Sequence, residues 1–116
     1  LLRESDIVSV HAPLNEKTAG LIGEKELAMM KPTSYIVNMG RGGIVVEEAL
    51  VKAVDEGVIA GAALDVFCVE PLPSDSCFLN ARHPERLRLA PHVAWASVEA
   101  RERLVGMVAE NIEKGW

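Results

Sequence analysis

Short apolar runs rich in β-branched residues alternate along the chain with longer segments in which apolar residues recur every three or four positions. This alternation is typical of parallel strands joined by crossover helices. The pattern predicts four strands, over residues 6–10, 35–39, 60–66 and 87–90. It predicts three helices, over residues 23–30, over residues 47–56 and from Ser97 to near Gly115. We therefore expect an α/β fold built on a parallel sheet.

Local signals place the ends of these elements. The first helix should stop before Lys31-Pro32, and Gly57 should end the second helix, whose buried face carries Leu50, Ala53 and Val54. Ser97 is a candidate N-cap for the last helix, in which Leu104, Val105, Val108 and Ile112 share one face. Residues 68–86 hold three of the six prolines and are predicted to form one long loop.

Composition narrows the class of protein. The 116 residues, 49% of them hydrophobic, predict a single packed domain. The net charge of -5 comes from scattered acids without a cluster of Lys and Arg, so we exclude nucleic acid as a main partner. Apolar runs fall far short of the roughly 18 residues that span a bilayer, and no membrane partner or secretory signal is expected. Cys68 and Cys77 match no metal spacing and are expected to be free thiols in the cytoplasm.

Candidate chemistry gathers where the predicted strands end. In open parallel sheets, ligands bind outside the carboxyl ends of the strands, because the loops there converge on one edge. Each residue taken singly has a plain structural alternative, such as a solvated arginine or a strand-ending glutamate, but their convergence on one edge favours a functional site. The residues that follow the four strands are His11-Ala12-Pro13, Arg41, Asp65 with Glu70, and His92.

Four ordered motifs make the chain resemble the D-isomer-specific 2-hydroxyacid dehydrogenases. The resemblance covers essentially the whole chain, and it implies the C-terminal half of a Rossmann-type, doubly wound NAD(P)-binding domain. The stretch from Trp95 to Arg101 is most similar to the glycerate dehydrogenase or hydroxypyruvate reductase branch. The motifs are His11-Ala12-Pro13-Leu14 with Thr18, Gly20, Leu21 and Ile22; Asn38-Met39-Gly40-Arg41-Gly42-Gly43; Ala63-Leu64-Asp65-Val66 with Glu70-Pro71; and Pro91-His92-Val93-Ala94-Trp95.

The resemblance implies hydride transfer between NAD(P)H and a small 2-oxoacid or D-2-hydroxyacid, with three catalytic residues. His92 would supply the proton, Glu70 would favour its charged ring, and the planar guanidinium of Arg41 would bind the substrate carboxylate. Asp65 resembles the residue that bonds the nicotinamide carboxamide. The side chains of His11 and His83 are expected to be structural or exposed. The residues implied to line the cofactor are His11, Ala12, Pro13, Asn38, Met39, Gly40, Arg41, Asp65 and His92.

The chain departs from the family pattern in two places. Val46 stands where the family usually has a helix-capping aspartate, a loss that typically costs about 1 kcal/mol of helix stability. The Gly-x-Gly-x-x-Gly turn that binds the pyrophosphate and the family's substrate domain are both absent from these 116 residues. We therefore expect a cloned piece, a proteolytic fragment or a truncated gene product that has no dehydrogenase activity by itself.

Two further expectations concern partners and alternatives. A strand left unpaired at the sheet edge invites association, so we expect a homodimer. A nucleotide-sensing, corepressor-like binding module of the same family remains an alternative to an enzyme. A Rossmann-type methyltransferase would have no use for an arginine, a glutamate and a histidine at three strand ends. The resemblance implies that the residues choosing NAD or NADP, and the substrate, lie outside this sequence.

Overall fold

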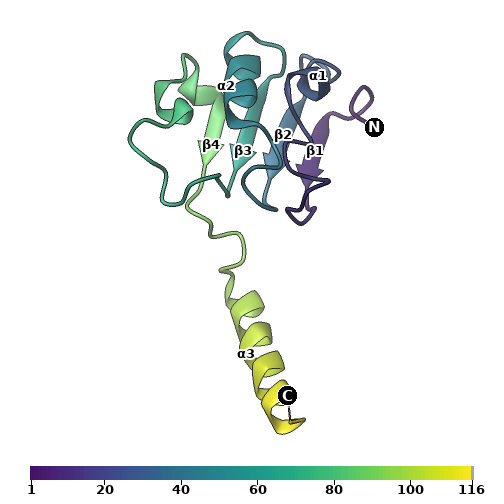
Figure 1. Cartoon of the computed structure of the whole chain (residues 1–116), viewed down its shortest axis with the longest axis vertical. Helices are drawn as coiled ribbons and strands as arrows, with labels where there is room; N and C mark the ends of the chain where they lie inside the picture. The colour runs from purple at the N-terminus through teal and green to yellow at the C-terminus, as the bar shows by residue number, and fades with distance from the viewer. Residues whose placement is uncertain (116) are drawn as a thin grey trace.

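A four-stranded parallel sheet forms the centre of the computed structural model, which describes residues 1–115 (Figure 1). The strands lie side by side in chain order: β1 (Ile7–Val10), β2 (Tyr35–Asn38), β3 (Gly61–Leu64) and β4 (Leu87–Leu89). Every neighbouring pair is parallel. The predicted α/β fold with four strands and three helices is confirmed, although each strand is shorter than its apolar run suggested.

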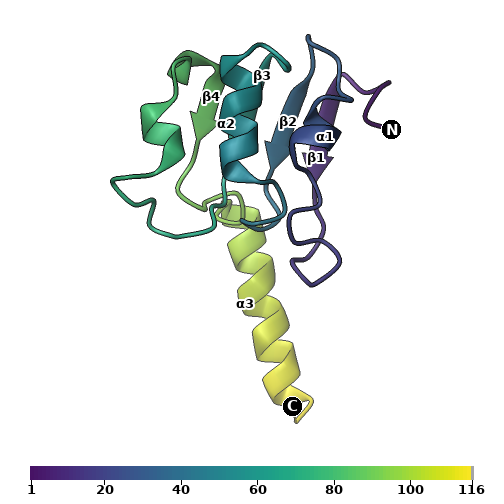
Figure 2. The same cartoon turned by 45° about the horizontal axis from the view of Figure 1, so that its top comes forward.

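Both crossover helices cover the same face of the sheet. Helix α1 (Glu24–Leu27) joins β1 to β2, and α2 (Glu47–Asp55) joins β2 to β3 (Figure 2). The side chains of Leu27 and Leu50 are fully buried against Ile36 of the central strand β2. Right-handed crossovers between strands that follow one another in a sheet place their helices on one side, which explains the arrangement.

The first helix is shorter than the predicted span of residues 23–30. Beyond Leu27 the backbone tightens, because the N–H of Met29 bonds to the Glu26 carbonyl and that of Met30 to the Leu27 carbonyl, each three residues back. The apolar periodicity persists through this turn, since both Leu27 and Met30 are buried. Periodicity therefore marked the buried face correctly but overestimated the length of the α-helix.

The connection from β3 to β4 is not the uninterrupted loop that the prolines predicted. Two short 3₁₀ turns, η1 (Cys77–Asn80) and η2 (Pro84–Arg86), interrupt it. Phe78 of η1 is buried and meets the ring of Phe67 edge to face, with ring centroids 5.6 Å apart. This aromatic pair gives the segment enough buried area to order it locally. The predicted free thiols are confirmed at Cys68 and Cys77.

The two ends of α2 agree with the sequence. Val46 occupies the N-cap position and its side chain makes no capping hydrogen bond, as expected from the missing aspartate. Gly57 follows the helix with a φ of 71°, a left-handed conformation that glycine adopts without the steric cost paid by other residues. The predicted buried residues Leu50, Ala53 and Val54 all face the core.

The last helix, α3 (Val98–Glu113), extends away from the sheet domain and accounts for the long dimension of 54 Å (Figure 1). Ser97 is its N-cap, as predicted, and the Ser97 hydroxyl accepts a hydrogen bond from the N–H of Ala100 at 3.2 Å. The side chains of Leu104, Val105 and Val108 are exposed along it. Within residues 1–115, no helix combines the length and the apolar character needed to cross a membrane.

Substitution of the core leucine tests this packing. We expect Leu50→Ala to lower the free energy of unfolding by about 2–5 kcal/mol, because the side chain is fully buried and its removal leaves a cavity. Leu79→Ala is the matched control, since Leu79 is exposed, and it should change stability by less than about 0.5 kcal/mol. Urea denaturation followed by circular dichroism measures both. Equal effects of the two substitutions would contradict the assigned core.

Candidate active site

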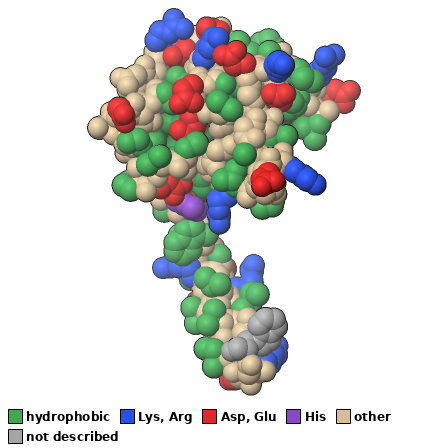
Figure 3. All heavy atoms as spheres, viewed as in Figure 1, with side chains coloured by type: hydrophobic (Ala, Val, Ile, Leu, Met, Phe, Trp, Pro, Cys, Tyr) green, Lys and Arg blue, Asp and Glu red, His purple; other side chains and the backbone are tan. Residues whose placement is uncertain are grey.

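Strand register brings the predicted site residues to one edge of the sheet. Val10 pairs with Asn38, Asn38 with Leu64, and Leu64 with Leu89, so that the four strands end at nearly the same level. The segments that follow them therefore leave the sheet together. Figure 3 shows a histidine with acidic and basic side chains close by at this edge, just above α3.

Glu70 and His92 form the central contact of this edge. Glu70 Oε2 lies 2.7 Å from His92 Nδ1, and Glu70 Oε1 accepts a hydrogen bond from the Phe67 N–H at 2.9 Å. The hydrogen bond with His92, followed by that from Phe67, lowers the pKa of Glu70. Glu70 is therefore a carboxylate at neutral pH and can only accept, so Nδ1 of His92 must carry the proton that it donates. The second ring nitrogen, Nε2, is left for a ligand.

The backbone holds His92 in an unusual conformation. His92 has a φ of 56°, in the left-handed region that non-glycine residues seldom adopt. The buried carboxylate of Asp65 accepts hydrogen bonds from the N–H groups of Val93 and Ala94, each at 2.8 Å. The indole Nε1 of Trp95 donates to the His92 carbonyl at 2.8 Å. These three bonds fix the turn and so the direction of the imidazole.

Arg41 lies on a turn that is held from within. The side chain of Asn38, 2% exposed, donates to the Arg41 carbonyl and accepts from the Gly40 N–H, each at 3.0 Å. Arg41 Nη1 donates to the carbonyl of Gly40 at 2.9 Å, and the side chain is exposed. Across residues 1–115 no carboxylate forms an ion pair with Arg41. Its guanidinium therefore remains available for an anionic ligand.

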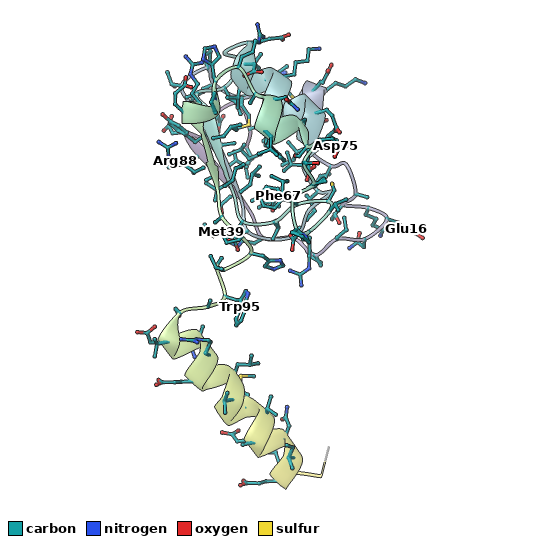
Figure 4. The ribbon with its side chains drawn as sticks, turned by 90° about the vertical axis from the view of Figure 1, so that its left-hand side faces the viewer. Glu16, Met39, Phe67, Asp75, Arg88 and Trp95 are labelled. Atoms are coloured by element: carbon teal, nitrogen blue, oxygen red, sulfur yellow. The ribbon has the colours of Figure 1, made fainter. Side chains whose placement is uncertain are left out.

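Three hollows adjoin this edge. One of about 640 Å³ is bounded by residues 11–14 and 39–41, and one of about 290 Å³ is lined by Met39 and Asp65 among others. The third, of about 540 Å³, is lined by Phe67, Glu70 and His92 and by several prolines and aliphatic residues. Figure 4 shows Met39 at the lower edge of the sheet and Trp95 between the sheet domain and α3.

The hollow between residues 11–14 and 39–41 has a mixed lining. His11 and Arg41 stand there beside small and apolar residues, and a Cβ at Gly40 would lie 3.0 Å from the Ala12 carbonyl, just beyond β1. The residues that the sequence proposed for the cofactor, from His11 to Pro13 and from Met39 to Arg41, thus lie together. Asp65 borders the neighbouring hollow, next to Met39.

The remaining histidines lie apart from the Glu70–His92 pair. His11 Nε2 is 2.7 Å from the Ser9 hydroxyl, and His83 Nδ1 is 3.1 Å from Glu85 Oε1. No group of three metal-ligating side chains gathers anywhere in the described part of the chain.

Sequence reasoning did not foresee that Asn38 holds the Arg41 turn. A buried, hydrogen-bonding Asp65 was open from the sequence as its structural alternative, but its partners after His92 were not foreseen. The only available signal was position. Each of these polar residues lies at or just beyond the end of an apolar strand, where a buried side chain needs hydrogen-bond partners.

Comparison with known proteins agrees with this geometry. Residues 1–94 match the model of the family described as D-isomer specific 2-hydroxyacid dehydrogenase, NAD binding domain. A glyoxylate reductase of Korarchaeum cryptofilum is 53% identical over 112 residues, which are 97% of this chain and 33% of that protein. The chain thus spans about a third of the length of the curated relatives that it matches.

Two solved structures are similar as well. The NAD complex of a D-isomer specific 2-hydroxyacid dehydrogenase from Lactobacillus delbrueckii has a TM-score of 0.84 and 32% identity, covering 98% of this chain and 38% of that one. An NADPH-dependent glyoxylate/hydroxypyruvate reductase from Sinorhizobium meliloti has a TM-score of 0.73 and 33% identity, covering 83% and 49%. The branch predicted from the residues around Trp95 is represented among these relatives.

The bonds from Asp65 give a direct test of the His92 turn. We expect Asp65→Asn to lower the free energy of unfolding by about 1.5–3 kcal/mol, because one backbone N–H loses a charged, buried acceptor. Hydrogen exchange at Val93 and Ala94 should become faster. Asp6→Asn is the matched control, since Asp6 forms an exposed ion pair with Lys31, and its effect should stay below about 1 kcal/mol. Unchanged exchange at both amides would contradict the role of Asp65.

Proposed function

Because the chain belongs to the D-isomer-specific 2-hydroxyacid dehydrogenases and matches their NAD-binding domain, we propose that it is the nicotinamide-facing half of that domain in an oxidoreductase. The parent enzyme reduces a small 2-oxoacid, such as glyoxylate or hydroxypyruvate, to the corresponding 2-hydroxyacid, which has the D configuration where C2 is a stereocentre. The observation that carries the proposal is the 2.7 Å contact of Glu70 with His92, at the edge where Arg41 is free of any partner carboxylate in residues 1–115.

Each residue of the site has a defined task. Arg41 binds the substrate carboxylate through its planar fork and polarises the oxo group. His92 donates a proton from Nε2 to the oxygen of the oxo group, and Glu70 accepts the hydrogen bond from Nδ1 throughout, which stabilises the charged ring. When bound, the reduced nicotinamide supplies the hydride that the oxo carbon accepts. In the reverse direction His92 accepts the hydroxyl proton.

The cofactor would be held by backbone more than by charged side chains. Residues 11–13 and 39–40 border the hollow next to Arg41 and would line the nicotinamide ring. The Asp65 carboxylate bonds two backbone N–H groups and has lone pairs left for a carboxamide N–H. Asn38 uses its amide on the Arg41 turn and would act on the cofactor through that turn. Either NAD or NADP is compatible with these contacts.

A chimaeric enzyme tests the reaction. The chain would replace the matching third of the Korarchaeum cryptofilum glyoxylate reductase, and oxidation of NADH and NADPH would be followed with glyoxylate and hydroxypyruvate. We expect activity, a loss in kcat of about 10²–10⁴-fold in His92→Gln, and a raised KM for the oxoacid in Arg41→Lys. His83→Gln is the matched control and should leave both constants unchanged. A folded chimaera that binds NADH but reduces neither oxoacid would refute the proposal.

The same assay applies to the 116-residue chain alone. We propose that it is inactive, because these residues contain no Gly-x-Gly-x-x-Gly turn to bind the pyrophosphate. Steady oxidation of NADH with either oxoacid by this polypeptide would disprove that statement while supporting the assigned chemistry.

We also infer that the chain forms a homodimer. In support, Leu104, Val105, Val108 and Ile112 form an exposed apolar stripe on α3, and β1 is an unpaired sheet edge within the described residues. Light scattering after gel filtration at high concentration should give a dimer mass. Val108→Glu should shift the mass toward a monomer, whereas Arg103→Glu, away from the stripe, should not. A monomer mass for the unaltered chain at all concentrations would exclude the dimer.

A further inference from the structure

The loop after β3 determines where the Glu70 carboxylate lies. Its two oxygens are both engaged, Oε1 with the Phe67 N–H and Oε2 with His92 Nδ1. Glu70 therefore reaches His92 only while the segment 67–70 keeps its position over the sheet edge. Residues 65–76 contain no helix or strand, so regular backbone hydrogen bonding does not fix this segment. Contacts from other elements must hold it.

One such contact comes from the first residue of α2. Glu47 Oε1 accepts a hydrogen bond from the Cys68 N–H at 2.7 Å, across 21 positions of sequence. A second contact comes from Gly42 of the Arg41 turn. A Cβ at Gly42 would lie 2.0 Å from the carbonyl carbon of Phe67, so the turn and the loop touch backbone to backbone. Glu47 thus bonds the loop at the residues that pass the Arg41 turn.

We propose that Glu47 is a positioning residue, whose carboxylate holds segment 67–70 against the start of α2 so that Glu70 meets His92. The catalytic importance of this role rests on the proposed function, but the role itself does not. A hydrogen bond from a backbone N–H to a carboxylate is roughly twice as strong as one between neutral groups. Its loss would free the segment to move relative to His92.

A general benefit of acids at a helix start does not account for the contact. Glu48 occupies the same first turn of α2 and would favour the helix dipole equally, yet its side chain is exposed and forms no hydrogen bond to the described residues of the loop. Of these two acids, only Glu47 forms a hydrogen bond to the loop. Glu48 is therefore a matched control for charge and for helix stability.

The charged groups around the two carboxylates determine what a titration would show. The Cys68 thiol lies next to Glu47, and burial, together with the charge of Glu47, raises the pKa of this thiol to about 11. The thiol is therefore neutral over the acid range. Glu70 faces His92 and the Phe67 N–H, which lower its pKa, and Asp65, whose charge acts in the opposite direction. Loss of the first two contacts would raise the pKa of Glu70 toward its ordinary value.

The experiment follows the Glu70 carboxyl carbon by NMR in the 116-residue chain, from about pH 2 to about pH 7, assigned by comparison with Glu70→Gln. Glu47→Ala should raise the pKa of Glu70, because the loosened segment weakens its bonds to His92 and Phe67. If Glu47 acted on Glu70 only through its negative charge, removing that charge would lower the pKa of Glu70. The direction of the pKa shift therefore distinguishes a positioning role from a charge effect. Glu47→Gln keeps an oxygen acceptor but removes the charge, so the pKa of Glu70 should stay at or below that of the unaltered chain, and Glu48→Ala should not raise it.

A second variant covers the case in which Glu47→Ala does not fold. Glu47→Asp keeps the charge at the helix start but is one methylene too short to reach the Cys68 N–H, so it too should raise the pKa of Glu70. The proposal is overturned if the pKa of Glu70 is unchanged or lowered in a folded Glu47→Ala or Glu47→Asp variant that retains its helix content. In the chimaera, Glu47→Ala should lower kcat by roughly tenfold to a hundredfold and change KM little.

The two proposals fail separately. The titration needs neither cofactor nor substrate, so a raised pKa of Glu70 in an inactive chimaera would leave the positioning role intact and count against the dehydrogenase function only. If the chimaera is active but the pKa of Glu70 does not rise when Glu47 is replaced, the dehydrogenase function is supported and the positioning role is refuted.

Discussion

Four parallel strands end at the same level because their registers align Val10, Asn38, Leu64 and Leu89 across the sheet. The candidate site depends on this alignment, since it brings segments from distant parts of the sequence to one edge. The two crossover helices pack on one face of the sheet, and each returns the chain to the start of a new strand beside the previous one. The core residues of α2 and β2 therefore support the site at a distance, by keeping the strands in register.

Carboxylates hold the loops at this edge. Asp65 bonds the backbone N–H groups after His92, Glu70 bonds that of Phe67, and Glu47 bonds that of Cys68. Loop N–H groups that lack strand partners need acceptors, and an ionised carboxylate is a strong one. Glu70 also contacts Nδ1 of His92 at 2.7 Å, so the carboxylate that orders the loop after β3 is the one that orients the imidazole.

Family membership, the contact of Glu70 with His92 and the exposed guanidinium of Arg41 are consistent with one another. The family model and the NAD-bound structural neighbour support a dinucleotide-binding domain, and the hollow beside residues 11–13 brings together residues that were proposed for the cofactor. The chain is about a third as long as its curated relatives. The residues present include the contact of Glu70 with His92 and the exposed guanidinium of Arg41, and they contain no Gly-x-Gly-x-x-Gly turn for the pyrophosphate.

The sequence by itself determined the class of fold and the choice of candidate site residues, because both follow from local patterns. Alternation of apolar runs indicated the number and the chain positions of the strands and the buried face of α2, and the positions of Arg41, Glu70 and His92 after strands indicated one edge. The order of the strands across the sheet came only from the structure. Tertiary structure decided the contacts that act across long separations. The Glu47 bond to the Cys68 N–H spans 21 positions, and the Asp65 bonds to Val93 and Ala94 span 28 and 29. No periodicity encodes such contacts, since an acid at a helix start or a strand end looks the same whether or not a loop folds over it. Likewise, the left-handed backbone of His92 follows from the bonds that surround it and not from its own preference.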